Sequence, residues 1–234
     1  NPSEHQGPLV ENGLTMLRKA NGTEPQTLDP HRAEDVSSAN ILRDLYEGLA
    51  LTGPDGGPKP GAAESWTMSE DGLRYVFHLR PTARWSNGDP VVAADFVAGM
   101  RRTVDPATGS NYGMILAPIA QAEAILAGQA KPDTLGVRAL DDHTLEIRLK
   151  APTPYFLSLL THSTTYPIHR PSLAAHGDRF TRPGNLVTNG AYQLTEAVVQ
   201  SHITLSRNPD YWDNAHTRID KVRSRLQVMA PAGD

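Results

Sequence analysis

The stretch AAESWTMSEDGLRYVFHLRPTARWSNGDPVVAADFVAGMRR, residues 62–102, carries the strongest structural signal in this chain. Polar and apolar residues alternate over 74–79, which predicts a strand with one buried face. Gly72 precedes this strand and favours a tight turn, so a hairpin is expected. The second half predicts a helix over about 93–102, with Asp95 near its N-terminus and arginines at its end, as the helix dipole favours. Such a unit builds a scaffold and carries no chemistry of its own.

The composition of the 234 residues excludes several classes of protein. A formal net charge of −4, with the charges interspersed, argues against nucleic acid as a partner, because phosphate binding needs a basic surface. The chain has no cysteine, which excludes disulfides, thiolate nucleophiles and cysteine-based zinc sites. No apolar run approaches the roughly 18 residues of a membrane-spanning helix.

Outward from the quoted stretch, apolar periodicity predicts short helices and strands in irregular alternation. Ser37 or Ser38 is expected to cap a helix whose apolar stripe includes Ile41 and Leu45, and Gly48 is expected to end it. The other predicted elements are strands at 14–19, 137–140, 144–149, 191–195, 203–207 and 222–228, and helices at 119–126, 155–160 and 171–176. Because this order is not a regular βαβ repeat, an α/β fold with a mixed sheet is predicted.

No combination of residues has the pattern of a catalytic or metal site. The loop at 53–58 is rich in glycine but lacks the Gly-Lys-Ser/Thr ending of a phosphate loop, and its prolines remove backbone donors. His162 and Ser163, with the acidic turn at 141–143, supply the residue types of a Ser/His/Asp site without the nucleophile-elbow pattern. None of the nine histidines is spaced as a helical metal ligand. The sequence therefore predicts a protein that is not an enzyme, with no catalytic residue, no metal and no cofactor.

Several motifs follow one another in an order that is similar to a known family. They are NGTE (21–24), TLDPH (27–31), RDLYEGL (43–49), the quoted stretch, DDHTLE (141–146), PGN (183–185), VTNGAY (187–192) and YW (211–212). In this order the chain resembles the peptide-type solute-binding proteins of bacterial ABC importers, and most closely their oligopeptide-binding, OppA-type members. The similarity runs from about residue 15 to 225, which chance does not produce.

The resemblance implies a mixed-sheet periplasmic-binding-protein lobe with an inserted α+β subdomain. Residues 1–46 and 169–234 are expected to form the discontinuous first lobe, and 47–168 the inserted subdomain. Family members are considerably longer and enclose their ligand between two lobes, so we expect the second lobe to be missing from this chain. The family often has a Ser/Thr cap where this chain has Val92, and the helix that follows is expected to be weakly capped.

The resemblance also implies where a ligand would lie. In the family, an extended peptide is held mainly through its main chain, as an added strand. The matching segment is Glu34, Asp35 and Val36, just before the predicted cap, and its backbone groups are expected to be free for a ligand. Tyr112 and His162 match positions that face the cleft. By residue type alone, the first three would be a solvated loop that enters a helix.

The expected function is the extracytoplasmic, periplasmic oligopeptide-binding component of an ABC importer, with short peptides and the membrane permease as partners. The chain opens at Asn1, so we expect an export signal to have been removed. Two alternatives remain open: a dipeptide, nickel or haem carrier of the same family, or a vestigial truncated product with a non-transport interaction role. In this truncated form we expect impaired ligand capture, with peptides bound at millimolar strength at best, and self-association through an exposed lobe face.

Overall fold

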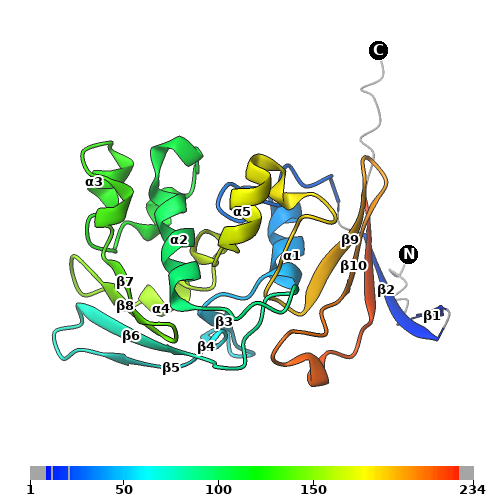
Figure 1. Cartoon of the computed structure of the whole chain (residues 1–234), viewed down its shortest axis with the longest axis horizontal. Coiled ribbons are helices and arrows are strands. Elements are labelled where there is room, and N and C mark those ends of the chain that lie inside the picture. The colour runs from blue at the N-terminus through cyan, green and yellow to red at the C-terminus, as the bar shows by residue number, and fades with distance from the viewer. Residues whose placement is uncertain (1–8, 12, 21, 227–234) are drawn as a thin grey trace, which may run out of the picture.

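The computed structural model describes residues 9–11, 13–20 and 22–226. Positions 227 and 228 of the last predicted strand, and the ends of the predicted first lobe at 1–8 and 227–234, lie outside the described residues. Figure 1 shows two larger sheets toward the two ends of the long axis, with α1 (Val36–Leu45) and α5 (Arg170–His176) between them. The buried apolar side chains of both parts form one continuous cluster.

The first sheet is mixed, as predicted. Its strands are β1 (Leu9–Glu11), β2 (Leu14–Ala20), β11 (Lys221–Arg225), β10 (His202–Arg207) and β9 (Tyr192–Val198), in that spatial order. Neighbours are antiparallel except β2 and β11, which run parallel with Val222 opposite Leu17. The sheet therefore joins the start of the chain to the segment after residue 190. Helix α1 packs against β9, and Ile203 and Leu205 of β10 are buried.

The second sheet is antiparallel and contains the quoted hairpin. Its spatial order is β5 (Ala63–Met68), β6 (Arg74–Leu79), β8 (Thr144–Arg148) and β7 (Val137–Asp141). Helix α2 (Ala93–Val104) packs against it through β7, and Phe96 and Met100 of the helix are fully buried. On β6, Phe77 is buried and His78 is exposed, which is the alternation that the sequence predicts.

The remaining elements are short. They are β3 (Ala50–Thr52), β4 (Pro58–Pro60), α3 (Ala122–Leu126), α4 (Phe156–Leu159) and 3₁₀ turns at Pro106–Thr108, Gly113–Leu116, Pro132–Thr134, Ser163–Thr165, Gly177–Thr181 and Asn214–His216. The helix predicted at 119–126 begins later, because Gln121 has a left-handed φ of 70° and Ile119 forms a β-bridge with Leu149. A left-handed residue cannot continue a right-handed helix.

The cap of α1 differs from the prediction. Asp35, not Ser37 or Ser38, is the N-cap: its carboxylate accepts the Ser38 backbone N–H at 3.0 Å and the Ser38 hydroxyl at 2.5 Å. Each of the two carboxylate oxygens accepts one donor, and an aspartate is among the preferred N-cap residues. The helix ends at Leu45, so the predicted role of Gly48 is also wrong.

Gly48 is needed for close packing instead. A Cβ at this position would lie 2.6 Å from the carbonyl oxygen of Leu160, a contact that real Cβ atoms do not make. The segment after α1 and the segment after α4 can approach each other only because residue 48 has no side chain.

The N-terminus of α2 is better held than its Val92 cap suggests. The Asp95 carboxylate accepts the Val92 backbone N–H at 3.0 Å and the Trp85 indole N–H at 3.0 Å, and the Arg170 Nε donates to it at 3.0 Å. Asp95 and Trp85 are buried. The Val92 side chain makes no cap hydrogen bond, as the sequence predicts, but Asp95 supplies the reciprocal half of a capping box and anchors the backbone of Val92.

A buried glutamate joins α1 to the chain after residue 188. The two carboxylate oxygens of Glu47 accept the Tyr211 hydroxyl and the Trp212 indole N–H, each at 2.7 Å. The backbone of Glu47 exchanges two hydrogen bonds with the side chain of Asn189, at 3.0 and 2.9 Å. The Arg80 guanidinium lies 3.7 Å from the centre of the Trp212 ring. This junction connects four motifs that are far apart in the sequence.

Candidate functional site

A groove runs beside α1 and has a volume of about 440 Å³. It is lined by one face of α1 (Val36, Ala39 and Arg43), by Thr52 and Ile115, and by the segment that follows α4 (Ser158, Leu159, Thr161, His162, Ser163 and Tyr166). We call it the α1 groove. Its walls are mostly apolar or neutral polar, which suits a ligand held by shape and backbone hydrogen bonds.

Residues 34–36 lie at the N-terminal end of α1, and of these three Val36 lines the α1 groove. The Val36 side chain is 75% exposed at the first turn of α1. Within the described part of the chain, no hydrogen bond uses the backbone N–H of Glu34, Asp35 or Val36, or the carbonyl of Glu34. An unpaired backbone N–H on Val36 is expected at a helix N-terminus. The unpaired backbone N–H and C=O of Glu34 are not explained by the helix end. This short extended segment could therefore accept an added strand.

The side chain of Glu34 is hydrogen-bonded to the loop that precedes the 3₁₀ turn Gly113–Leu116. Its carboxylate accepts a hydrogen bond from the Asn111 side-chain amide. The neighbour of Asn111, Tyr112, packs its ring edge-on against His162, with the ring centroids 5.9 Å apart and the planes at 85°. The structure thus brings Glu34, Val36, Tyr112 and His162 to one region, although 126 positions separate Val36 from His162.

The protonation of His162 follows from its contacts. Its Nδ1 accepts the Thr164 backbone N–H at 3.2 Å, which caps the 3₁₀ turn Ser163–Thr165, and also lies 2.8 Å from the Thr164 hydroxyl. The proton of the neutral ring is therefore on Nε2. Burial lowers the pKa of His162 below its ordinary value of 6.5, so the ring is neutral at pH 7. It offers one N–H donor and no charge.

Most residues that line the α1 groove were not predicted from the sequence. Arg43 and Tyr166 line the groove, and neither residue type signalled that in the sequence. Arg43 lies in the motif RDLYEGL, seven positions after Val36. This helical spacing places both residues on one face of a helix, and it was the one feature of the sequence that could have indicated Arg43. Tyr166 stacks on Tyr46, with ring centroids 5.8 Å apart, and forms the floor between α1 and the 3₁₀ turn.

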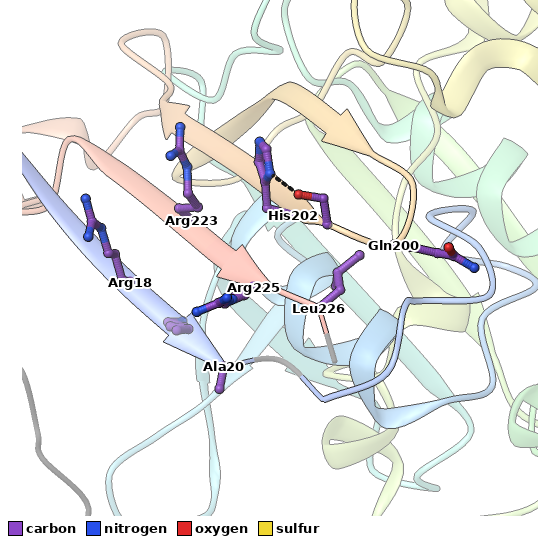
Figure 2. Close-up of a pocket in the computed structure, with 9 residues that line it drawn as sticks. Arg18, Ala20, Gln200, His202, Arg223, Arg225 and Leu226 are labelled. Carbon is purple, nitrogen blue, oxygen red and sulfur yellow. Dashed lines mark hydrogen bonds between the residues drawn. The ribbon is translucent and has the colours of Figure 1, made fainter. Parts of the chain in front are cut away.

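A second, larger hollow lies at one end of the mixed sheet (Figure 2). It has a volume of about 640 Å³ and is lined by Arg18, Lys19, Ala20, Gln200, Ser201, His202, Arg223, Arg225 and Leu226. Figure 2 shows that its arginine side chains come from β2 and β11, with the hydrogen bond between Ser201 and His202 at its side. None of the residues that the sequence singled out lies there. We call it the basic hollow.

The structure also separates the candidate catalytic residues. Asp141 accepts the backbone N–H of His143 at 2.9 Å within its own hairpin turn, and Nδ1 of His162 is occupied by Thr164. Among the described residues, no group of three His, Cys, Asp or Glu side chains is placed to hold a metal ion. In the same part of the chain, no helix is long and apolar enough to cross a bilayer.

Comparisons with known proteins give a consistent result. Residues 57–227 match the family model described as "Bacterial extracellular solute-binding proteins, family 5 Middle". The chain is 47% identical over 220 residues to the periplasmic oligopeptide-binding protein OppA of Escherichia coli K12, which covers 91% of this chain and 40% of that protein. It is 43% identical over 209 residues to the probable deoxycholate-binding periplasmic protein YgiS of the same strain, which covers 88% of this chain and 39% of that protein.

A solved structure agrees with these matches. The crystal structure of Haemophilus influenzae OppA in complex with RPPGFSPFR superposes with a TM-score of 0.89 at 39% identity. The superposition covers 93% of this chain and 43% of that one. The chain spans about 40% of the length of the curated relatives it matches.

Proposed function

The chain belongs to family 5 of the bacterial extracellular solute-binding proteins, and from that premise we propose that its α1 groove binds oligopeptides for an ABC importer. The resemblance drawn from the motifs is confirmed by these matches, and so is the expected mixed-sheet lobe. In this proposal Glu34, Asp35 and Val36 present main-chain groups to the peptide. Tyr112 and His162 form the wall that faces it.

The observation that carries the proposal is the unpaired backbone at 34–36 beside the groove. Strand addition needs free N–H and C=O groups next to space for side chains. Glu34 supplies both backbone groups, and the neighbouring groove of about 440 Å³ supplies the space. The neutral Nε2–H of His162 adds a donor for a peptide carbonyl. These features favour ligands that are recognised through the main chain, with little demand on side chains.

Location, partners and domain division belong to the same proposal. The OppA and YgiS relatives are named as periplasmic proteins, and we propose the periplasm for this chain as well, with a membrane permease as its partner. Residues 1–46 and 169–234 would act as one lobe and 47–168 as an inserted subdomain. The pairing of β2 with β11 and the separate sheet of β5 to β8 support this division.

The 234 residues alone should bind peptide weakly. Three or four main-chain hydrogen bonds at about 0.5–1.5 kcal/mol each give roughly 2–6 kcal/mol. Association costs an estimated 4–15 kcal/mol, which these bonds barely offset, so we expect a dissociation constant that is millimolar at best. The exposed side chains of Val36, Tyr112 and Met114 would remain open to water in this form. We expect them to promote self-association, seen as a concentration-dependent sedimentation coefficient.

Nuclear magnetic resonance at millimolar ligand tests the function directly. The ¹⁵N-labelled chain would be titrated with mixed tri- to pentapeptides, and the amides of 34–36 and the His162 ring should shift with saturation. The amides of Arg223 and Arg225 in the basic hollow serve as the internal control and should stay unchanged. Shifts confined to the basic hollow, or no shifts at 10 mM peptide, would refute the proposal. A parallel titration with deoxycholate tests the ligand named for YgiS.

A further inference from the structure

We infer that Arg43 makes the α1 groove selective for peptides with an acidic side chain about three residues beyond the residue paired at Val36. The inference rests on the proposed peptide-binding function. It names a class of substrate for that groove. Nothing in the main-chain mode of binding by itself requires such a preference.

The distance follows from helix geometry. Val36, Ala39 and Arg43 are spaced by three and four residues, so they lie on one face of α1, and all three line the groove. Seven residues of α-helix rise about 10 Å. An extended peptide advances about 3.3 Å per residue, so three residues cover the same distance. A peptide that pairs at 34–36 and follows α1 therefore brings a side chain to Arg43.

Charge makes this position selective. Arg43 is the one charged side chain among the described residues that line the groove, because His162 is neutral. The nearby acids are occupied: Asp35 caps α1, and Glu34 accepts from Asn111. Asp44 pairs with Lys19 at 3.6 Å. Across the described ranges, no carboxylate lies within 4.0 Å of a nitrogen of Arg43, whose guanidinium donates only to the side chain of Asn40.

The remaining guanidinium donors can bind a carboxylate. A guanidinium presents five N–H groups in a planar fork that matches the two oxygens of a carboxylate. The bond to Asn40 uses one nitrogen and restricts the side chain, so less freedom is lost when an anion binds. A basic side chain at the same place in the peptide would be repelled. If Arg43 served only to pair with Asn40 on the surface of α1, peptide binding would not depend on the charge of the peptide.

A scan of peptide charge tests the inference. The peptides are C-terminally amidated pentaalanine and its variants with one aspartate at positions 2 to 5, titrated into the ¹⁵N-labelled chain at low salt. One aspartate position should bind about five- to tenfold more tightly than pentaalanine, and the same position with lysine should bind more weakly. In Arg43→Gln the preference should vanish, so that the aspartate peptide and pentaalanine bind with the same affinity. Arg43→Lys should keep part of it, and Arg84→Gln, an exposed arginine outside the groove, should keep all of it.

The possible failures are distinguishable. If pentaalanine binds at 34–36 but the aspartate scan is flat, or if Arg43→Gln keeps the preference, the inference is wrong and the proposed function stands. If no peptide shifts residues 34–36, both are wrong. Raising the salt to 0.5 M should remove the preference without removing pentaalanine binding, since only the first depends on charge.

Discussion

Replacing Glu47 with glutamine should remove much of the pH dependence of this protein's stability. The Glu47 side chain is only 2% exposed, and its carboxylate contacts the Tyr211 hydroxyl and the Trp212 indole. Burial raises the pKa of Glu47 from 4.5 to about 7, against the opposing effects of these two donors and of the Arg80 charge; the Asp213 charge adds to the rise. The folded protein therefore keeps a proton on Glu47 that the unfolded chain releases.

The sign and size of the effect follow from this difference. Between pH 4.5 and about 7 the folded state binds more protons at Glu47 than the unfolded state, so stability falls as the pH rises. The contribution is complete below pH 4.5 and is lost above about pH 7, with a total of about 3 kcal/mol. Glutamine resembles the protonated acid: its carbonyl can accept from Trp212, and its amide can donate to the Tyr211 oxygen.

The assay is urea unfolding of the wild type and Glu47→Gln at pH 5, 6, 7 and 8. The difference in unfolding free energy between the two should change by about 1.4 kcal/mol per pH unit from pH 5 to 7, and the variant should be relatively more stable at the higher pH. Glu64→Gln, an exposed glutamate on β5, is the control and should follow the wild type. A flat difference curve would refute the reasoning. So would the opposite slope, because it would mean that Tyr211 and Trp212 stabilise the ionised form.

Three further outcomes are expected. Gly99→Ala should lower the unfolding free energy by about 2 kcal/mol, because the new Cβ would lie 2.3 Å from the Tyr166 carbonyl oxygen. This cost should exceed the gain from the better helix propensity of alanine. Chemical denaturation measures the change, and an unchanged unfolding midpoint would contradict the packing argument. Asp95→Asn should lower the unfolding free energy by about 2 kcal/mol, because it weakens the hydrogen bonds from Val92 and Arg170. The melting temperature should fall by about 4–8 °C. Asp55→Asn, in an exposed loop, is the control and should leave the melting temperature unchanged. Calorimetric titration of the 234 residues with mixed tri- to pentapeptides should give no micromolar binding, and a micromolar constant would overturn the weak-binding estimate.

The sequence alone determined the local elements and the family. Alternation over 74–79 and the glycine turn before it predicted β6 and its hairpin, and helical periodicity predicted α2 to within two residues. These predictions succeed because they depend on contacts between neighbours in the chain. The order of the motifs from 21 to 212 identified the peptide-type solute-binding family, which the comparisons confirm. The proposed site residues came from that resemblance and not from residue chemistry.

The tertiary structure decided which side chains satisfy which groups. The sequence offered Ser37 and Ser38 as caps of α1, but Asp35 takes that position. Asp95 anchors the start of α2 by accepting hydrogen bonds from Val92, Trp85 and a distant arginine. Which carboxylate accepts from which donor depends on which N–H groups are buried away from water. The tertiary structure decides which groups are buried. The α1 groove likewise exists only because the start of α1 meets a segment more than a hundred residues later. Periodicity describes neighbours in sequence, and it contains no information on which distant surfaces pack together.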